Sequence, residues 1–346
     1  MAHSVLSQEI HQQPGVISVL LAKETAAVNK IAKSIRHKFK YVVIAARGTS
    51  DNAARYAQYL FGVHNQLQVA LATPSLFTMY DTPPNLKGAL VIGISQSGQS
   101  PDIVSVLAEG KYQGCPTLAI TNDSDSPLAQ TADYLIPLHA GEEKAVAATK
   151  TYTASLAALA ILSCSLQPGS DRLERLNKVP QIMQATLANL RALINRSERY
   201  RYMEYCAVIG RGFNYATAFE IALKVKELTR IVAEPYSSAD FRHGPIATVT
   251  RGFPLILIAP SGAVSHDLVE LIRDLERLNA EMIVISDDSH TFSKASFFLP
   301  IPSGLPEWLS PLISILPGQL FALKLAESRG LNPDQPTGLH KVTETR

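Results

Sequence analysis

The sequence predicts an α/β protein of two tandem domains, each built on a doubly wound parallel sheet and related by internal duplication. First, the chain repeats its motifs at a spacing of 164 to 165 residues. Second, short β-branched runs are followed by turns rich in Gly, Ser or Thr and then by alanine-rich helical patterns, which is typical of βαβ units. Third, 346 residues with 46% apolar and 18% charged side chains are enough to bury two cores.

The repeat is visible in three pairs of segments. They are Val42–Ala54 with Ala207–Ala218, Leu90–Ser100 with Leu255–Ser265, and Leu118–Asp125 with Ile283–His290. In this register Arg47-Gly48 corresponds to Arg211-Gly212, and Ser97-Gly98 corresponds to Ser261-Gly262. Any two α/β units have strands followed by glycines, but a constant spacing over three separated pairs of segments favours duplication.

Six apolar runs are expected to be the buried strands of the two sheets, because strands covered on both faces are almost continuously apolar. They are Val42–Ala45, Ala89–Ile94, Thr117–Ile120, Ala207–Ile209, Pro254–Ile258 and Met282–Ile285. The best break between the copies is Gln167–Asp171, and a helical pattern follows from Val179 to Ile194. We therefore expect a first domain over residues 1–175, with an N-terminal helical segment, and a second over residues 176–346.

Composition narrows the class of partner. The net charge is +2 with scattered basic residues, so neither nucleic acid nor a membrane surface is expected as a partner. Three separated cysteines indicate buried thiols in a reducing compartment, and no spacing of ligands indicates a metal or another cofactor. The start of the chain lacks a signal pattern, and the apolar run Leu156–Leu166 is too short to cross a bilayer. These features predict a soluble, cytoplasmic protein with a small-molecule ligand.

Two loops of the first copy carry hydroxyl groups at strand ends. Ser95–Asp102 follows a strand, and its Pro101 is well placed to open a helix, whose N-terminus favours an anion. A second loop, after Arg47, would meet the same ligand at the carboxyl edge of the sheet. The loops lack the lysine of a nucleotide-binding P-loop, so the pattern favours a phosphate monoester. The candidate residues are Gly48, Thr49, Ser50, Ser95, Gln96, Ser97 and Ser100. Simple helix capping by serine is the alternative.

The second copy differs at both places. Its loop Ala259–Ala263 has one hydroxyl group fewer and contains a proline, so only the first copy is expected to have a working phosphate-binding loop. Its helical pattern Ala218–Leu228 places Glu220, Lys224 and Glu227 on one face among apolar residues, which suits proton transfer. A surface ion pair is the plainer interpretation of these three residues.

Two further segments carry candidate residues. His243 precedes Gly244-Pro245, which restricts its backbone, and a histidine that titrates near neutral pH suits the opening of a sugar ring. The polar tail Asp334–Arg346 contains His340 and Lys341, and a frayed end is the alternative there.

These residues together resemble the sugar isomerase (SIS) family, whose domains have a flavodoxin-like fold, and especially the isomerase half of glucosamine-6-phosphate synthases. The resemblance covers nearly the whole chain. Its motifs are Glu9–Pro14, Arg47–Ser50, Ser95–Gly98, Val146–Lys150, Glu227, His243–Pro245 and the tail around Lys341.

The resemblance implies roles for these residues. The serines, Gln96 and Thr49 would hold the sugar phosphate, and Val146 and Ala148 would contact the sugar through backbone groups. Glu227 would move a proton between C1 and C2, and Lys224 would stabilise the developing negative charge. His243 would come from the neighbouring subunit of a homodimer and assist ring opening. Lys341, beside His340, would close over the carbonyl or form an imine.

The chain also departs from the synthases, and the departures favour ammonia release. A glutamine-hydrolysing domain is absent from the sequence, Ala148 replaces a usual serine and His340 a small residue, and the ending is similar to stand-alone amino-sugar phosphate deaminases. The leading hypothesis is a glucosamine-6-phosphate deaminase. The alternatives are an aminotransferase-like or plain ketose–aldose isomerase, a deglycase for fructosamine phosphates, and a non-catalytic phosphosugar sensor.

Overall fold

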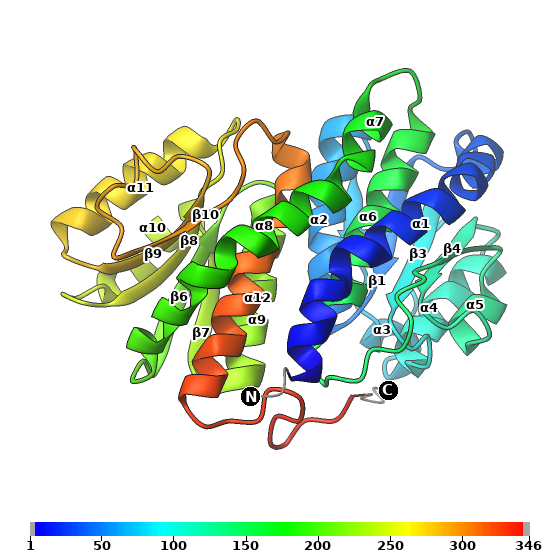
Figure 1. Ribbon diagram of the computed structural model, residues 1–346. Coiled ribbons are helices and arrows are strands. Elements are labelled where there is room, and N and C mark those ends of the chain that lie inside the picture. Colours follow the sequence, from blue (N-terminus) through cyan, green and yellow to red (C-terminus); the bar gives the residue numbers. More distant parts are fainter. Residues whose placement is uncertain (1–3, 342–346) are drawn as a thin grey trace. The chain divides into compact units, whose positions relative to one another are not determined.

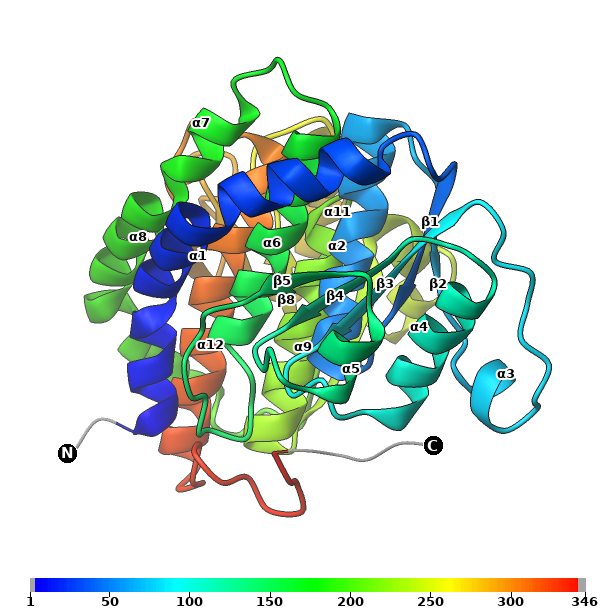
Figure 2. The same ribbon diagram turned by 90° about the vertical axis from the view of Figure 1, so that its right-hand side faces the viewer.

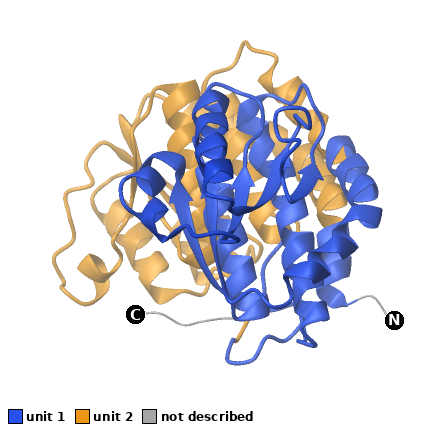
Figure 3. Ribbon diagram, turned by 90° about the vertical axis from the view of Figure 1, so that its left-hand side faces the viewer, with its two compact units in different colours: residues 1–11, 144–149, 181–339 blue, residues 12–143, 150–180, 340–346 orange. Residues whose placement is uncertain are grey.

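The computed structural model describes residues 4–341, and the chain divides into two compact units (Figures 1 and 3). Unit 2 contains residues 12–143 and 150–180 together with the chain from His340 on. Unit 1 contains the chain up to His11, residues 144–149 and residues 181–339. Each unit carries one five-stranded parallel sheet, which confirms the predicted fold class.

The first sheet lies in unit 2 and has the strand order β2-β1-β3-β4-β5. Its strands are β1 (Tyr41–Ala45), β2 (Val69–Leu71), β3 (Ala89–Ser95), β4 (Thr117–Thr121) and β5 (Tyr134–Pro137). The helices that connect them are α2 (Gly48–Asn65), α3 (Ser75–Thr78), α4 (Pro101–Tyr112) and α5 (Pro127–Thr131). The long helix α1 (Val5–Ile35) precedes the sheet, and α6 (Lys150–Leu166) and α7 (Arg172–Asn177) follow it.

The second sheet lies in unit 1 and has the order β10-β9-β8-β6-β7. Its strands are β6 (Tyr205–Gly210), β7 (Val232–Ser237), β8 (Pro254–Ile258), β9 (Glu281–Ser286) and β10 (Phe297–Pro300). Its α-helices are α8 (Val179–Leu193), α9 (Asn214–Thr229), α10 (Ser238–Arg242), α11 (Ser265–Arg277) and α12 (Ser310–Ser328). Three 3₁₀ helices complete the unit: η1 (Ile194–Tyr200), η2 (Pro245–Thr248) and η3 (Glu307–Leu309).

The two sheets have the same topology. If the strands of each copy are numbered along the chain, both orders read 2-1-3-4-5, the flavodoxin-like order of a doubly wound sheet. The six predicted buried strands are confirmed as β1, β3, β4, β6, β8 and β9. The four edge strands were missed because they are short or half-exposed, as in the three residues of β2 and the largely open β7.

The core of the first sheet follows from the alternation of side chains along its strands. Val43, Val91 and Ala119 point to one face, where they pack against Val106 and Leu107 of α4. Figure 2 shows α4 and α5 beside this sheet. The intervening strand residues are buried as well, as expected of a sheet covered on both faces.

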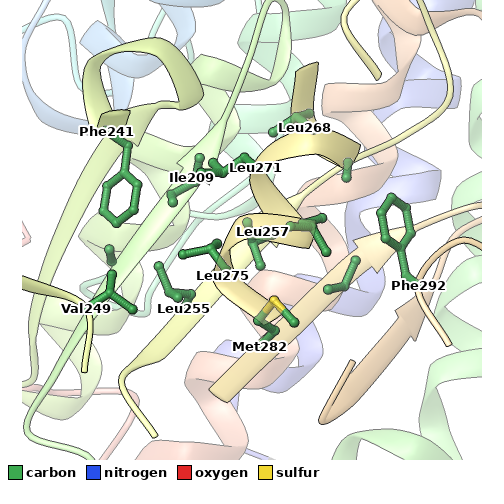
Figure 4. Close-up of a cluster of buried hydrophobic side chains, with 14 residues drawn as sticks. Ile209, Phe241, Val249, Leu255, Leu257, Leu268, Leu271, Leu275, Met282 and Phe292 are labelled. Carbon is green, nitrogen blue, oxygen red and sulfur yellow. The ribbon is translucent and has the colours of Figure 1, made fainter. Parts of the chain in front are cut away.

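The second core follows from the amphipathic pattern of α11 (Figure 4). Leu268, Leu271, Ile272 and Leu275 have the spacing of one helix face, and all four are buried. They pack against inward-pointing side chains of β6, β8 and β9: Ala207, Ile209, Leu255, Leu257, Met282 and Val284. The hydrophobic effect thus fixes α11, and with it the loop that leads from β8 into that helix.

One apolar helix is longer than the run noted in the sequence. The segment Glu307–Ser328 is long and apolar enough to cross a membrane. However, 94% of its most apolar stretch is buried inside the protein, as in a core helix, and the segment packs against α9 within unit 1.

The expected break between the copies coincides with a loop. Residues 167–171 connect the end of α6 to the start of α7. The two units are not continuous in sequence, because residues 144–149 group with unit 1. The domain boundary at residues 175 and 176 stays a prediction.

Candidate active site

The candidate phosphate residues meet at one place in the first sheet. In the order β2-β1-β3, the connections run in opposite directions from β1 and β3, and this reversal is where doubly wound folds bind ligands. The loops after Ala45 and Ser95 leave the carboxyl ends of these two neighbouring strands. Thr49 and Ser50 lie in the first turn of α2, and Ser100 immediately precedes α4. The fold therefore brings the two predicted loops together. We call this place the first switch point.

The serine loop of the first switch point has a fixed shape. Ser95 Oγ accepts a hydrogen bond from the Gly98 amide (3.1 Å), and Ser97 Oγ accepts one from the Gln99 amide (3.3 Å). Gly98 has a φ of +62°, and a Cβ on it would overlap Ser126. The loop therefore needs glycine here both for its backbone angle and for its close packing.

The same loop is anchored to the neighbouring strand β4. The carbonyl oxygen of Gln96 accepts hydrogen bonds from the Asn122 amide (3.1 Å) and from Thr121 Oγ1 (3.3 Å). The carbonyl oxygen of Gly98 accepts one from the Leu128 amide (3.1 Å). Because backbone contacts hold the loop, its hydroxyl groups are placed before any ligand arrives.

The capping alternative does not describe Ser100. This residue occupies the N-cap position of α4, but its side chain makes no capping hydrogen bond. Pro101 takes the first helical position, as predicted. The N-termini of α2 and α4 therefore meet near half-exposed hydroxyl groups, where the backbone N–H groups and the helix dipoles favour an anion.

An ion pair that the sequence analysis did not identify joins the two loops. Arg47 Nε lies 2.8 Å from Asp102 Oδ2, and the Asp102 side chain is fully buried while Arg47 is half-exposed. Asp102 lies in the first turn of α4, and Arg47 is the N-cap residue of α2. The repeat contained a signal for this pair, because Arg47 corresponds to Arg211, 164 residues later, and Asp102 corresponds to Asp267, 165 residues later.

The second switch point is where the loops after β6 and β8 leave the second sheet. Its backbone resembles that of the first switch point, but its loop amides have different partners. Gly212 has a φ of +59°, close to the +52° of Gly48. The amide of Ser261 donates to Asp287 Oδ1, and the amide of Ala263 donates to Glu307 Oε2, both at 2.7 Å. Carboxylates of the chain itself thus occupy amides of this loop.

The acid of the second switch point has several partners. Asp267 lies 2.7 Å from Arg242 and 3.7 Å from Arg211, and it also accepts a hydrogen bond from Ser238. Burial raises the pKa of Asp267, but the hydrogen bonds from Ser238 and Arg242 and the two arginine charges outweigh it, so the pKa lies below 3.8.

The three candidates on α9, expected to share one helix face, lie together in the structure. Lys224 Nζ lies 2.6 Å from Glu227 Oε2 and 3.4 Å from Glu220 Oε1. The Lys224 and Glu220 side chains are buried, at 1% and 0% exposed, whereas Glu227 is 22% exposed. The surface ion-pair interpretation is therefore wrong for Lys224 and Glu220, and Glu227 is the member of the cluster that solvent or a ligand reaches.

The sugar-contact candidates Val146 and Ala148 lie in the loop before α6. The amides of Lys144 and Ala145 donate to the carboxylate of Glu9 (2.5 and 3.3 Å), and the Val146 amide donates to the Asp334 carbonyl oxygen (3.2 Å). Val146 and Ala148 are both partly exposed. Glu9 belongs to a motif noted in the sequence, and its structural role is to shape this loop.

The three remaining candidates are His243, His340 and Lys341. His243 caps the C-terminus of α10 and is exposed, and among residues 4–341 its side chain forms no hydrogen bond. Lys341 Nζ lies 2.9 Å from Glu143 Oε2, a fully buried carboxylate that the sequence analysis did not single out. His340 is exposed beside it. The tail from Val342 on lies outside the described residues.

The candidates are thus divided between the two units. Unit 2 holds the serine loop, Thr49, Ser50 and the Lys341–Glu143 pair; unit 1 holds Glu227, Lys224, Val146, Ala148 and His243. Within residues 4–341, no three His, Cys, Asp or Glu side chains are grouped to hold a metal ion.

The SIS domain model matches residues 35–164 and 206–327, which contain the first and the second sheet. The chain belongs to the SIS domain family. It is 33% identical over 338 residues to a glutamine–fructose-6-phosphate aminotransferase (isomerizing) of Aquifex aeolicus, and 33% identical over 344 residues to one of Thermococcus kodakarensis. These matches cover 97% and 96% of this SIS chain but 57% of each relative, so the chain spans little more than half of their length.

Solved SIS structures share the fold over almost the whole chain. A proposed phosphosugar isomerase from Silicibacter pomeroyi matches with a TM-score of 0.87 and 31% identity, covering 96% of this chain and all of that one. The C-terminal domain of a glucosamine-fructose-6-phosphate aminotransferase from Francisella tularensis matches with a TM-score of 0.88 and 27% identity, covering 97% and 99%. A glucosamine-6-phosphate deaminase from Thermotoga maritima, at 21% identity and a TM-score of 0.80, shows the same fold.

Proposed function

We propose that this SIS protein is an enzyme that interconverts aldose and ketose sugar phosphates, and that it acts on an amino-sugar phosphate. The simplest reaction is the conversion of glucosamine 6-phosphate and water to fructose 6-phosphate and ammonia. The observation that carries the proposal is that the chain combines a hydroxyl-lined anion loop at the first switch point with a carboxylate–lysine cluster on α9. A protein that only bound the sugar would need the first and not the second.

Phosphate binding is assigned to the first switch point. The hydroxyls of Thr49, Ser50, Ser97 and Ser100 are half-exposed at the N-termini of α2 and α4. The full set proposed for the phosphosugar is Gly48, Thr49, Ser50, Ser95, Gln96, Ser97 and Ser100. A phosphate monoester would accept hydrogen bonds from these hydroxyls and from backbone N–H groups, with the helix dipoles compensating its charge.

Proton transfer is assigned to Glu227. In the open-chain aldehyde its carboxylate removes the proton from C2, and the electrons pass to the C1 oxygen to give an enediol-type intermediate. The carboxylic acid then returns the proton to C1, and a proton passes from the nitrogen to the C1 oxygen, which leaves a hydroxyl group at C1 and an imine at C2. Water adds to that imine and ammonia leaves, so the product is the ketose. Lys224, 2.6 Å from Glu227, supplies the positive charge that stabilises the negative intermediate.

Four further residues complete the proposed site. His243 opens the sugar ring, and we assign it to the site of the neighbouring copy in a homodimer, since it is exposed and ends the short helix α10. Lys341 approaches the carbonyl group of the open-chain sugar, while Val146 and Ala148 offer backbone groups to its hydroxyls. We also propose a cytoplasmic enzyme, in keeping with three cysteines that are all buried, free thiols.

A second candidate is the reverse direction, in which fructose 6-phosphate accepts nitrogen. It is favoured by the curated relatives at 33% identity, whose names describe a glutamine–fructose-6-phosphate aminotransferase. Both candidates use the same sugar carbons and the same base. They differ in whether ammonia leaves or an amide nitrogen enters.

The proposal is tested by incubating the purified protein with glucosamine 6-phosphate and measuring ammonia and fructose 6-phosphate in the same sample. We expect equal amounts of the two products. Glu227→Gln should lower the turnover number about 100- to 10,000-fold, with binding of the phosphosugar preserved. Glu270→Gln, on the solvent-exposed side of α11, is the matched control and should be unchanged.

Other outcomes separate the candidates. Fructose 6-phosphate consumption that needs glutamine or ammonia would favour the second candidate. Tight binding of phosphosugars without exchange of the C2 proton with solvent would overturn the enzyme assignment and support the sensor. Unchanged turnover in Glu227→Gln would contradict the role assigned to that residue.

A further inference from the structure

The C-terminal lysine of the proposed site is held by a buried acid. Lys341 follows an irregular segment after α12, yet its side chain is only 24% exposed. Its Nζ donates a hydrogen bond to Glu143 Oε2 at 2.9 Å. The two residues are 198 positions apart in sequence, so this contact ties Lys341 to a distant part of unit 2.

Glu143 is itself held by the first turn of α6. Its Oε1 accepts a hydrogen bond from the Thr151 amide (3.1 Å), and its Oε2 accepts one from Thr151 Oγ1 (2.9 Å). The amide is one of the N–H groups that the start of a helix leaves without a partner in the helix. A carboxylate whose side chain is 0% exposed and which accepts two hydrogen bonds at a helix N-terminus is thereby fixed in position.

Lys150, which is close to Glu143 in the sequence, forms its hydrogen bonds with other groups. Lys150 Nζ donates to Gln12 Oε1 (2.9 Å) and to the Glu142 carbonyl oxygen (2.7 Å). Lys341, in contrast, forms an ion pair with the Glu143 carboxylate. A buried carboxylate strongly favours a cationic partner, because an uncompensated charge in the interior is costly.

We propose that Glu143 is a positioning residue that sets the place and orientation of the Lys341 amine in the active site. This inference rests on the proposed function, in which Lys341 approaches the carbonyl of the open-chain sugar. In this proposal Glu143 acts through Lys341, its ion-pair partner. Its removal should therefore slow the chemical step and leave phosphosugar binding almost unchanged.

The kinetic test compares Glu143→Gln, Lys341→Met and the double variant, with glucosamine 6-phosphate as the probe. Each single variant should lower kcat at least 10-fold and change KM less than about threefold, since the phosphate loop is intact. The double variant should be no slower than Lys341→Met alone, because a residue that acts through another adds nothing once that partner is gone. Glu143→Asp should recover part of the activity, and the exposed neighbour variant Glu142→Gln should behave as wild type.

These results separate the inference from the proposed function. Wild-type kcat in Glu143→Gln, with Lys341→Met inactive, would overturn the inference and leave the function standing. Independent, multiplying losses in the double variant would also overturn it, because Glu143 would then act by itself. Unchanged activity in Lys341→Met would overturn both the inference and the role assigned to that lysine.

A second measurement does not need turnover. Trypsin cleaves after lysine, so the rate of cleavage after Lys341, followed by mass spectrometry, reports how firmly that side chain is held. We expect Glu143→Gln to be cleaved at least fivefold faster than wild type and Glu142→Gln to be cleaved at the wild-type rate. Equal rates in Glu143→Gln and wild type would overturn the inference even if no substrate is turned over.

Discussion

At the first switch point, two loops lined with hydroxyl groups meet at helix N-termini, whereas at the second switch point two loop amides are bound by carboxylates of the chain itself. The backbone frames correspond: Gly48 and Gly212 both have a positive φ, and each follows an arginine. The difference lies in the ligands of the loop amides. In the second copy Asp287 binds the Ser261 amide and Glu307 binds the Ala263 amide. Duplication has thus preserved the topology, but in the second copy two internal carboxylates bind loop amides that an anion would otherwise contact.

The ion pairs of the two switch points differ in the same way. Asp102 is fully buried and pairs with Arg47, whereas Asp267 is one-third exposed and shares Arg242, Arg211 and Ser238. In the first copy Arg47 pairs with the buried acid, whereas in the second copy the corresponding acid is shared among several partners. Matched substitutions at corresponding positions test this contrast.

The largest expected effect comes from adding a methyl group to the corresponding glycines. Gly98→Ala forces a side chain into a positive φ and onto Ser126, a buried residue anchored to the Asp123 carbonyl oxygen, so we expect a loss of about 2–4 kcal/mol in unfolding free energy. Gly262→Ala meets the flexible carboxyl end of Glu307, and we expect about 1 kcal/mol or less. Urea denaturation of both variants measures this. Equal losses would show that the two loops are equally constrained.

A smaller effect is expected from removing the corresponding arginines. Arg47→Met leaves the buried Asp102 carboxylate without its arginine, which should cost about 2 kcal/mol, reduced from the value for a fully buried pair because Arg47 is half-exposed. Arg211→Met should cost less than about 0.5 kcal/mol, because Arg242 remains on Asp267 at 2.7 Å. Thermal unfolding at neutral pH checks the difference, and a larger loss in Arg211→Met would reverse the account.

The smallest effect is a pH dependence at the second switch point. The pKa of Asp267 lies below its ordinary 3.8, so its ionised form stabilises the fold above that pH, and this contribution is lost as the pH falls through the lowered pKa. Asp267→Asn should therefore cost about 1 kcal/mol at pH 7 and progressively less below about pH 4. Denaturation curves of both proteins from pH 7 to pH 3 measure it. A cost that is constant across this range would exclude the ionised carboxylate as the cause.

The central strands and the serine loop could be predicted from the sequence, because both are local patterns. A buried parallel strand is an apolar run, and an anion loop is a run of small and hydroxyl residues before a helix. Edge strands such as β2 are short and half-exposed, so they leave no such run. Their pairing is decided by the sheet they join.

The long-range pairs could not be predicted from the sequence for a different reason. Glu143 and Lys341, or Ala263 and Glu307, are brought together by the fold over 198 and 44 residues, and each member alone is an ordinary surface residue type. The pair Arg47–Asp102 is an exception, since its recurrence as Arg211 and Asp267 lay within the repeat. Internal duplication can therefore identify contacts when the repeat is compared residue by residue.

The most direct test of one working phosphate site per chain is calorimetric titration with glucosamine 6-phosphate, in the Glu227→Gln background so that turnover is prevented. We expect one glucosamine 6-phosphate site per chain. Ser97→Ala should weaken binding about 10- to 100-fold, as for a lost hydrogen bond to a charged group, and Ser261→Ala, the corresponding position of the second copy, should leave the affinity unchanged. Two sites per chain, or equal losses from the two serine variants, would contradict it.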